Sequence, residues 1–117
     1  MKMMNPMTKT AVSITQKRRI FVTRHAGAIA WLQEQGIAPC VIKSHIELGD
    51  IRAGDSVYGV LPIHWIAEIS LLDAEYFHLV IPVTSDLRGK ELTVAQLNQY
   101  GAYLQRYTAR AAEDHDA

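Results

Sequence analysis

Residues 19–27 decide the fold, and they read Arg19-Ile20-Phe21-Val22-Thr23-Arg24-His25-Ala26-Gly27. Residues 20–23 are apolar or β-branched, which is typical of a buried strand. Helix-forming residues follow at once over 26–35, and Gly36 supplies the usual C-terminal stop. A strand that passes directly into a helix is the opening unit of an α/β fold. Residues 23–27 are therefore expected at the end of the sheet where its strands have their carboxyl ends.

The pattern of strand and helix repeats along the chain. A second strand is predicted to begin at Cys40, with that cysteine buried at its head, and further strands are predicted over 56–61 and 76–81. Residues 47–55 are loop-like. Pro62 suits the first turn of a helix over 63–72, which is apolar nearly all round. One face of such a helix can cover a sheet, and the other suggests a subunit interface and therefore a homodimer.

The last predicted helix begins at the capping box Thr93-Val94-Ala95-Gln96. Its apolar stripe is supplied at helical spacing by Leu97, Tyr100 or Gly101, Leu104 and Tyr107. The resulting order, β-α-β-β-α-β-α, predicts an α/β fold with a small Rossmann-like sheet and helices on both faces. Residues 18–112 form the single expected domain, between a flexible leader over 1–17 and a frayed acidic tail over 113–117.

The composition narrows the functional classes. Across 117 residues, 12 basic and 12 acidic side chains cancel, yet residues 1–43 hold seven Lys/Arg against one acid. Zero net charge excludes a polybasic coat for long nucleic acid, although a local basic site for a small anion remains open. The single Cys40 cannot form an internal disulfide, which favours a reducing cytoplasm. No apolar run is long enough to span a membrane, and the leader is a poor signal peptide.

The first strand end carries the strongest site prediction. Ligands of open α/β sheets collect outside the carboxyl ends of the strands, and a helix N-terminus there suits phosphate. Thr23 provides a hydroxyl, and the planar guanidinium of Arg24 can donate two hydrogen bonds to phosphate oxygens. His25 provides a titratable imidazole, and Gly27, which has no side chain, lets a ligand approach the backbone closely. The alternative is that Arg24 forms a surface salt bridge and His25 merely starts the helix.

Other candidates are less specific. Leu61 and Pro62 end the third strand, and His64 in the next helical turn either faces the same crevice or lies at a dimer seam. Arg88 and Lys90 form a possible second phosphate clamp. The remaining histidines are interpreted as a hydrogen-bonded core or rim residue, His78, and as ordinary surface residues, His45 and His115.

Several chemistries lack support in the sequence. There is no glycine triplet of the dinucleotide type and no Walker-type Lys-Ser/Thr loop, so no cofactor is predicted. Cys40 has no basic neighbour in sequence that would favour a thiolate nucleophile. The spacing of His25, His64 and His78 matches no metal-ligand motif, so no metal site is predicted.

Five blocks occur in order between residues 18 and 107: Val22-Thr23-Arg24-His25-Ala26-Gly27-Ala28-Ile29, Ala53-Gly54-Asp55, Gly59-Val60-Leu61-Pro62-Ile63-His64 with Ala67-Glu68, Tyr76-Phe77-His78-Leu79, and Arg88-Gly89-Lys90-Glu91-Leu92. Together they resemble a small family of CRISPR-associated accessory proteins found beside type III systems, the sixteenth numbered group of the Csx proteins. Two positions depart from the family pattern. Ala26 stands where proline is usual, and Val60 stands where threonine is usual.

The resemblance implies a Rossmann-like, CARF-like homodimer that acts as a ring nuclease. Such an enzyme cleaves a cyclic oligoadenylate second messenger, here cyclic tetra-adenylate. A ribose 2′-hydroxyl can attack the adjacent phosphate, so the reaction needs no metal, and the protein must position the ribose and stabilise the phosphoryl oxygens. On this reading the catalytic residues are Arg24, His25 and His64, and the ligand-binding residues are Thr23, Gly27, Leu61, Pro62, Arg88 and Lys90.

Two alternatives from other functional classes stay open. A non-catalytic protein that sequesters the messenger would use Arg24, Gly27 and Arg88 without an acid or base. An interaction subunit would dock on a larger CRISPR effector through the apolar helix over 63–72.

Overall fold

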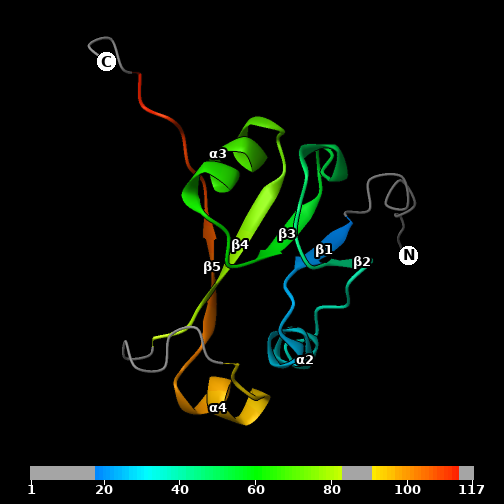
Figure 1. Cartoon of the computed structure of the whole chain (residues 1–117), viewed down its shortest axis with the longest axis vertical. Coiled ribbons are helices and arrows are strands. Elements are labelled where there is room, and N and C mark those ends of the chain that lie inside the picture. Colours follow the sequence, from blue (N-terminus) through cyan, green and yellow to red (C-terminus); the bar gives the residue numbers. More distant parts are fainter. Residues whose placement is uncertain (1–17, 83–90, 114–117) are drawn as a thin grey trace, which may run out of the picture.

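A computed structural model describes residues 18–82 and 91–113 of the chain (Figure 1). Its elements alternate between strands and helices, as the sequence predicts. In chain order they are β1 (Arg19–Val22), α2 (Ala26–Glu34), β2 (Val41–Lys43), the short 3₁₀ helix η1 (Leu48–Asp50), β3 (Ser56–Gly59), α3 (Ile63–Leu71), β4 (Glu75–Val80), α4 (Val94–Gln99) and β5 (Tyr103–Tyr107).

A single mixed sheet runs through the molecule in the order β2-β1-β3-β4-β5. The first four strands are parallel, and β5 pairs antiparallel with β4. Within β1, Ile20 pairs with Val41 on one side and with Val57 on the other. Because β1 has neighbours on both sides and helices on both faces, its apolar run is continuous rather than alternating.

Helices cover both faces of the sheet, which confirms the predicted α/β class. In Figure 1, α3 lies on one side of the sheet, and α2 and α4 lie on the other. Neighbouring residues of one strand point to opposite faces, so Ile20 packs in the core beneath α3 while Phe21 packs in the core beneath α2 and α4. The α3 core also holds Val57, Ile66, Ile69 and Tyr76, and the other core also holds Trp31, Leu32, Tyr58, Leu79 and Leu97.

The direction of strand addition reverses between β1 and β3. From β1 the chain returns through α2 to β2 on one side, whereas from β3 it returns through α3 to β4 on the other. Parallel crossovers are right-handed, so two connections that step in opposite directions place their helices on opposite faces. The carboxyl ends of β1 and β3 are therefore neighbours that lead into helices on different sides of the sheet.

The C-terminal part of the predicted element order is wrong. Helix α4 ends at Gln99, and Leu104 and Tyr107 lie in the strand β5 instead of extending a helix. Gly101 has a φ of +79°, a left-handed conformation that ends the helix. Residues 103–107 then pair with the open edge of β4, with Leu104 opposite Leu79 and Tyr107 opposite Tyr76. The order thus becomes β-α-β-β-α-β-α-β.

The predicted burial of Cys40 is also wrong. This residue is exposed and precedes β2, which begins at Val41. Its backbone N–H donates to the carbonyl of Arg19 at 2.7 Å, so the main chain is already held by β1 while the side chain points outward.

Helix α2 touches the chain just before α4 through its backbone. A Cβ atom placed on Gly27 would lie 1.8 Å from the carbonyl oxygen of Leu92, a distance that no real contact allows. Leu92 is itself buried, and its neighbour Thr93 forms the predicted capping box of α4 with Gln96. Gly27 therefore serves the packing of two segments that are far apart in the sequence.

We expect Gly27→Ala to lower the free energy of unfolding by about 1–3 kcal/mol, because the added methyl group forces the backbone of α2 away from Leu92. The measurement is urea denaturation followed by circular dichroism. Gly49→Ala is the matched control, since a Cβ there meets nothing within 4 Å. Equal unfolding midpoints for wild type and Gly27→Ala would contradict the close approach.

Candidate functional site

A crevice of about 450 Å³ lies at the carboxyl edge of the sheet, where the strand order reverses. It is lined by residues that follow β1, β2, β3 and β4 and by the inner faces of the helices. The lining residues are Val22, Thr23, Arg24, His25, Ala28, Leu32, Ser44, His45, Ile46, Gly59, Val60, Leu61, Pro62, Trp65, Leu79, Ile81, Leu92 and Leu97. Most of them are apolar, and the polar ones gather after β1 and β2.

The turn between β1 and α2 forms the polar rim of the crevice. The Thr23 hydroxyl accepts a hydrogen bond from the His25 backbone N–H at 3.1 Å, which fixes the turn. His25 is the N-cap residue of α2, yet its side chain makes no capping bond and is free for other contacts. Arg24 is exposed beside it, and within the described residues it forms no ion pair, so the salt-bridge alternative finds no partner there.

The opposite rim is the loop that follows β3. The buried Tyr76 hydroxyl accepts from the Leu61 N–H at 2.9 Å and donates to the Gly59 carbonyl at 3.0 Å. Burial raises the pKa of Tyr76 to about 12, so its hydroxyl keeps its proton at neutral pH. One side chain from β4 therefore holds both ends of the bend that contains Val60.

The structure brings together some of the predicted site residues and not others. Thr23, Arg24, His25, Leu61 and Pro62 all line the crevice. His64 and Gly27 do not: the His64 imidazole is exposed on α3 with its ring centre 6.3 Å from that of Trp65, and Gly27 packs against Leu92. The predicted clamp of Arg88 and Lys90, the leader over 1–17 and His115 lie outside the described residues.

Two lining residues were missed by reasoning from the sequence. His45, interpreted as an ordinary surface residue, is exposed but lines the crevice together with Ser44, and the Ser44 hydroxyl lies 3.3 Å from its Nδ1. Trp65 takes the place on α3 that was predicted for His64. The parallel pairing of β2 with β1 brings residues 44–46 to this edge, and only the strand order reveals that.

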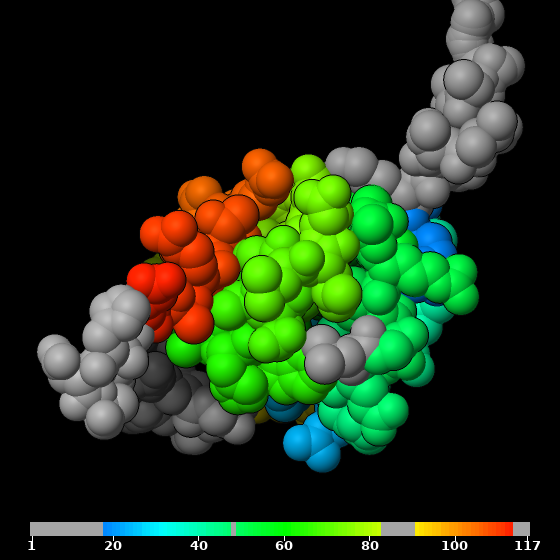
Figure 2. Space-filling model, turned by 90° about the horizontal axis from the view of Figure 1, so that it is seen from above, coloured from blue at the N-terminus to red at the C-terminus, as the bar shows by residue number. Residues whose placement is uncertain are grey.

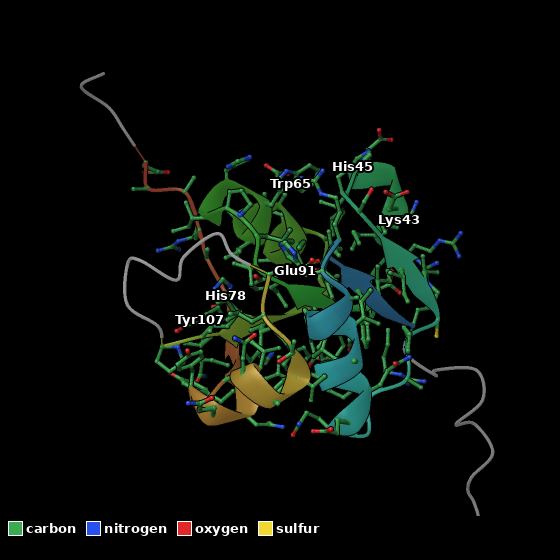
Figure 3. The ribbon with its side chains drawn as sticks, turned by 60° about the horizontal axis from the view of Figure 1, so that its bottom comes forward. Lys43, His45, Trp65, His78, Glu91 and Tyr107 are labelled. Carbon is green, nitrogen blue, oxygen red and sulfur yellow. The ribbon has the colours of Figure 1, made fainter. Side chains whose placement is uncertain are left out.

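Glu91 makes a further contact that the sequence did not indicate. Its Oε2 atom lies 3.4 Å from Nδ1 of His25, and both side chains are more than half exposed. In Figure 3, Glu91 lies between the beginning of α2 (cyan-blue) and the segment that leads into α4 (gold). The first rim of the crevice thus presents a guanidinium and an imidazole, and the Glu91 carboxylate, which is not among the lining residues, contacts that imidazole.

The other basic side chains in the described stretch 18–43 are engaged in contacts, and one of them, Arg19, donates from Nε to the Ala38 carbonyl oxygen. Arg18 donates to both carboxylate oxygens of Asp55, at 3.1 and 2.7 Å, and Lys43 lies 3.1 Å from Asp50. The pKa of Asp50 is lowered by the backbone hydrogen bond from Glu47 and by Lys43. Among residues 18–43, the basic side chains other than Arg24 are therefore taken up by these contacts, and Arg24 is the cation among the described residues that line the crevice.

One comparison with known proteins shows the family of this chain. Residues 20–110 match the family described as "Putative CRISPR-associated protein (Cas_VVA1548)", a span that contains every described residue of the crevice. The chain belongs to this CRISPR-associated family. Searches of curated proteins and of solved structures gave no match.

Two further observations concern the described part of this CRISPR-associated protein. Over residues 18–82 and 91–113, His, Cys, Asp and Glu side chains form no group of three or more that could hold a metal ion. No helix in the same ranges has the length and apolar character needed to cross a membrane.

His78, interpreted from the sequence as a hydrogen-bonded core or rim residue, is half-buried and hydrogen-bonded in the structure. Its Nδ1 lies 2.6 Å from the Tyr76 hydroxyl, and its ring meets the edge of Tyr107 at a centroid distance of 5.8 Å (Figure 3). Partial burial lowers the pKa of His78. The folded protein therefore prefers a neutral imidazole at this position, beside two phenol rings.

We expect His78 to make the fold less stable in acid. Because its folded pKa lies below the unfolded value of about 6.5, its contribution is complete above about pH 6.5 and is lost as the pH falls through the folded pKa. The advantage of wild type over His78→Gln should shrink between about pH 7.5 and about pH 5, measured by urea unfolding at each pH. Parallel stability curves for the two proteins would contradict this assignment.

Proposed function

We propose that this CRISPR-associated protein is a ring nuclease that binds and cleaves a cyclic oligoadenylate, with cyclic tetra-adenylate as its substrate. The observation that carries the proposal is the placement of Arg24 and His25 side by side at the start of α2, on the rim of a largely apolar crevice. A phosphodiester between nucleosides needs a cation for its oxygens, a proton acceptor and an apolar slot for the base. This edge of the sheet offers all three.

The walls of the crevice suit a nucleobase. Its volume of about 450 Å³ lies in the range of about 300–1,000 Å³ usual for small-molecule sites. The half-buried Trp65 offers an aromatic face, and stacking of a base on such a face is worth about 1–3 kcal/mol. A base placed in the crevice leaves its phosphate near Arg24 and near the N–H groups that begin α2.

The reaction uses a nucleophile from the substrate. The ribose 2′-oxygen forms a bond to the adjacent phosphorus, the bond from phosphorus to the 5′-oxygen breaks, and a 2′,3′-cyclic phosphate remains. His25 takes the proton of the 2′-hydroxyl, and water supplies a proton to the leaving 5′-oxygen. Arg24 stabilises the charge on the phosphoryl oxygens. No metal enters these steps, because the attacking oxygen belongs to the ring itself.

A symmetric ring also suits two copies of the protein. Figure 2 shows the face of the molecule that α3 covers, with β5 along its side. In α3 itself, Ile63 and Leu71 expose 74% and 77% of their surface, although both are apolar. An isologous dimer through α3 would bury them and would present two Arg24 side chains to one ring.

We expect wild type to convert cyclic tetra-adenylate into linear fragments in the presence of EDTA, resolved by liquid chromatography. Arg24→Ala should lower the single-turnover rate by about 10²–10³-fold, because it removes charge stabilisation from the phosphoryl oxygens. Arg52→Ala is the matched control. Arg52 is exposed near the opposite end of β3 and does not line the crevice, so this variant should cleave the ligand at the wild-type rate.

The outcomes of this assay separate the candidate functions. Intact ligand after long incubation at high protein concentration would reject the nuclease. If the intact ligand is nevertheless bound tightly, the protein sequesters the messenger. Normal cleavage by Arg24→Ala would keep the enzyme but reject this rim as its site.

We expect the protein to sediment at twice the mass of one chain. The double variant Ile63→Asp with Leu71→Asp should sediment as a monomer, because it places charges on the exposed side of α3. Analytical ultracentrifugation measures both masses, and circular dichroism confirms that the variant is folded. A wild-type monomer, or a double variant that remains dimeric, would exclude α3 as the dimer interface.

A further inference from the structure

Three contacts fix the backbone around Glu91. Gly27 packs against the carbonyl group of Leu92, and the Leu92 side chain is buried in the core. Thr93 is held by the capping box, with its N–H donating to Gln96 Oε1 at 2.9 Å and its hydroxyl accepting from the Gln96 N–H at 3.1 Å. The backbone position of Glu91 is therefore set by the packing of its neighbours and not by contacts of the Glu91 side chain.

The Glu91 carboxylate lies beside one edge of the His25 ring. Glu91 Oε2 lies 3.4 Å from Nδ1. An ionised carboxylate only accepts hydrogen bonds, so the favourable arrangement places a proton on Nδ1. In the neutral imidazole the other nitrogen, Nε2, is then unprotonated and carries its lone pair on the opposite edge of the ring.

We propose that Glu91 is the positioning residue of His25: it fixes the imidazole in the Nδ1–H tautomer and so makes Nε2 a proton acceptor for the substrate. This inference rests on the proposed function, because it assigns the tautomer that the cleavage step requires. Glu91 touches no reacting atom and acts only through His25.

The step gives each member of the pair one task. Nε2 takes the proton of the attacking 2′-hydroxyl while the oxygen–phosphorus bond forms, and the ring becomes an imidazolium. Glu91 stabilises that positive charge across Nδ1–H, and its carboxylate stays ionised throughout. After the 5′-oxygen has left with a proton from water, Nε2 returns its own proton to water. No proton, electron or atom is left over.

The exposure of the pair argues that its role is not structural. Side chains that are 59% and 61% exposed gain little stability from their mutual attraction, because water screens it. A bound ligand that covers the rim would exclude water and strengthen the same contact. The pair should therefore matter for turnover far more than for folding.

Helix α2 offers a matched control at its other end. Glu34 also links α2 to α4, since its Oε1 accepts from Asn98 Nδ2 at 3.1 Å, and it is also exposed. It contacts no histidine in this bond and does not line the crevice. Glu34→Gln therefore removes another exposed carboxylate that links α2 to the α4 region, without touching the proposed pair.

The first test measures cleavage of cyclic tetra-adenylate by Glu91→Ala, Glu91→Gln and Glu34→Gln. We expect Glu91→Ala to lose about 10- to 100-fold in kcat, a part of what a positioned base contributes, with KM changed less than about threefold. Glu91→Gln should recover part of the loss, because its amide oxygen still accepts from Nδ1–H. Glu34→Gln should match wild type. An effect on KM alone, or a loss of unfolding free energy in Glu91→Ala, would overturn the positioning role.

The second test does not depend on activity. Long-range ¹H–¹⁵N correlation spectra report which nitrogen of His25 carries the proton, with His25→Gln used to assign the signal. We expect Nδ1–H in wild type and a shift towards Nε2–H in Glu91→Ala. An unchanged tautomer would overturn the inference even if the protein cleaves the ring. If wild type cleaves nothing, the proposed function fails, and the spectra still decide whether Glu91 orients His25.

Discussion

The parallel pairing of β1 with both β2 and β3 is the constraint on which the site depends. Since right-handed crossovers leave β1 and β3 in opposite directions, α2 and α3 occupy opposite faces, and the space between their first turns cannot be filled by either helix. The turn at Thr23–His25 and the bend at Gly59–Leu61 face each other across that space. The crevice is thus a product of strand order, and its chemistry is added by the residues that follow each strand.

The polar groups of the rim are exposed while the floor beneath them is apolar. Arg24, His25 and Glu91 are all exposed to water in the free protein, so their mutual attraction is weak. A ligand that covers these side chains excludes water and lowers the local dielectric constant. The electrostatic attraction between them then becomes stronger at unchanged distances. Such a site stores little strain and gains most of its electrostatic strength only on binding.

The sequence predicts those parts of the protein that local patterns determine. The turn from β1 into α2, the stop at Gly36 and the capping box at Thr93 are all present, because each depends on a few adjacent residues. Strand β5 escaped prediction because Leu97, Leu104 and Tyr107 also satisfy a helical spacing, and only the open edge of β4 decides the matter. The roles of His45 and Glu91 at the site were not predicted for a related reason. His45 reaches the crevice through strand order, and Glu91 meets a histidine 66 residues away through the packing of Gly27 on Leu92.

The Tyr76 hydroxyl has a consequence for the energetics of recognition. By bonding to the backbone on both sides of Val60, it fixes a bend that would otherwise sample many conformations. The apolar tip of that bend is held outward before anything binds, so the ordering entropy of the second rim is lost during folding and not during association. A partner that contacts Val60 therefore meets a preorganised surface. Because this bend does not rearrange on binding, it selects partners by how well their shape fits it.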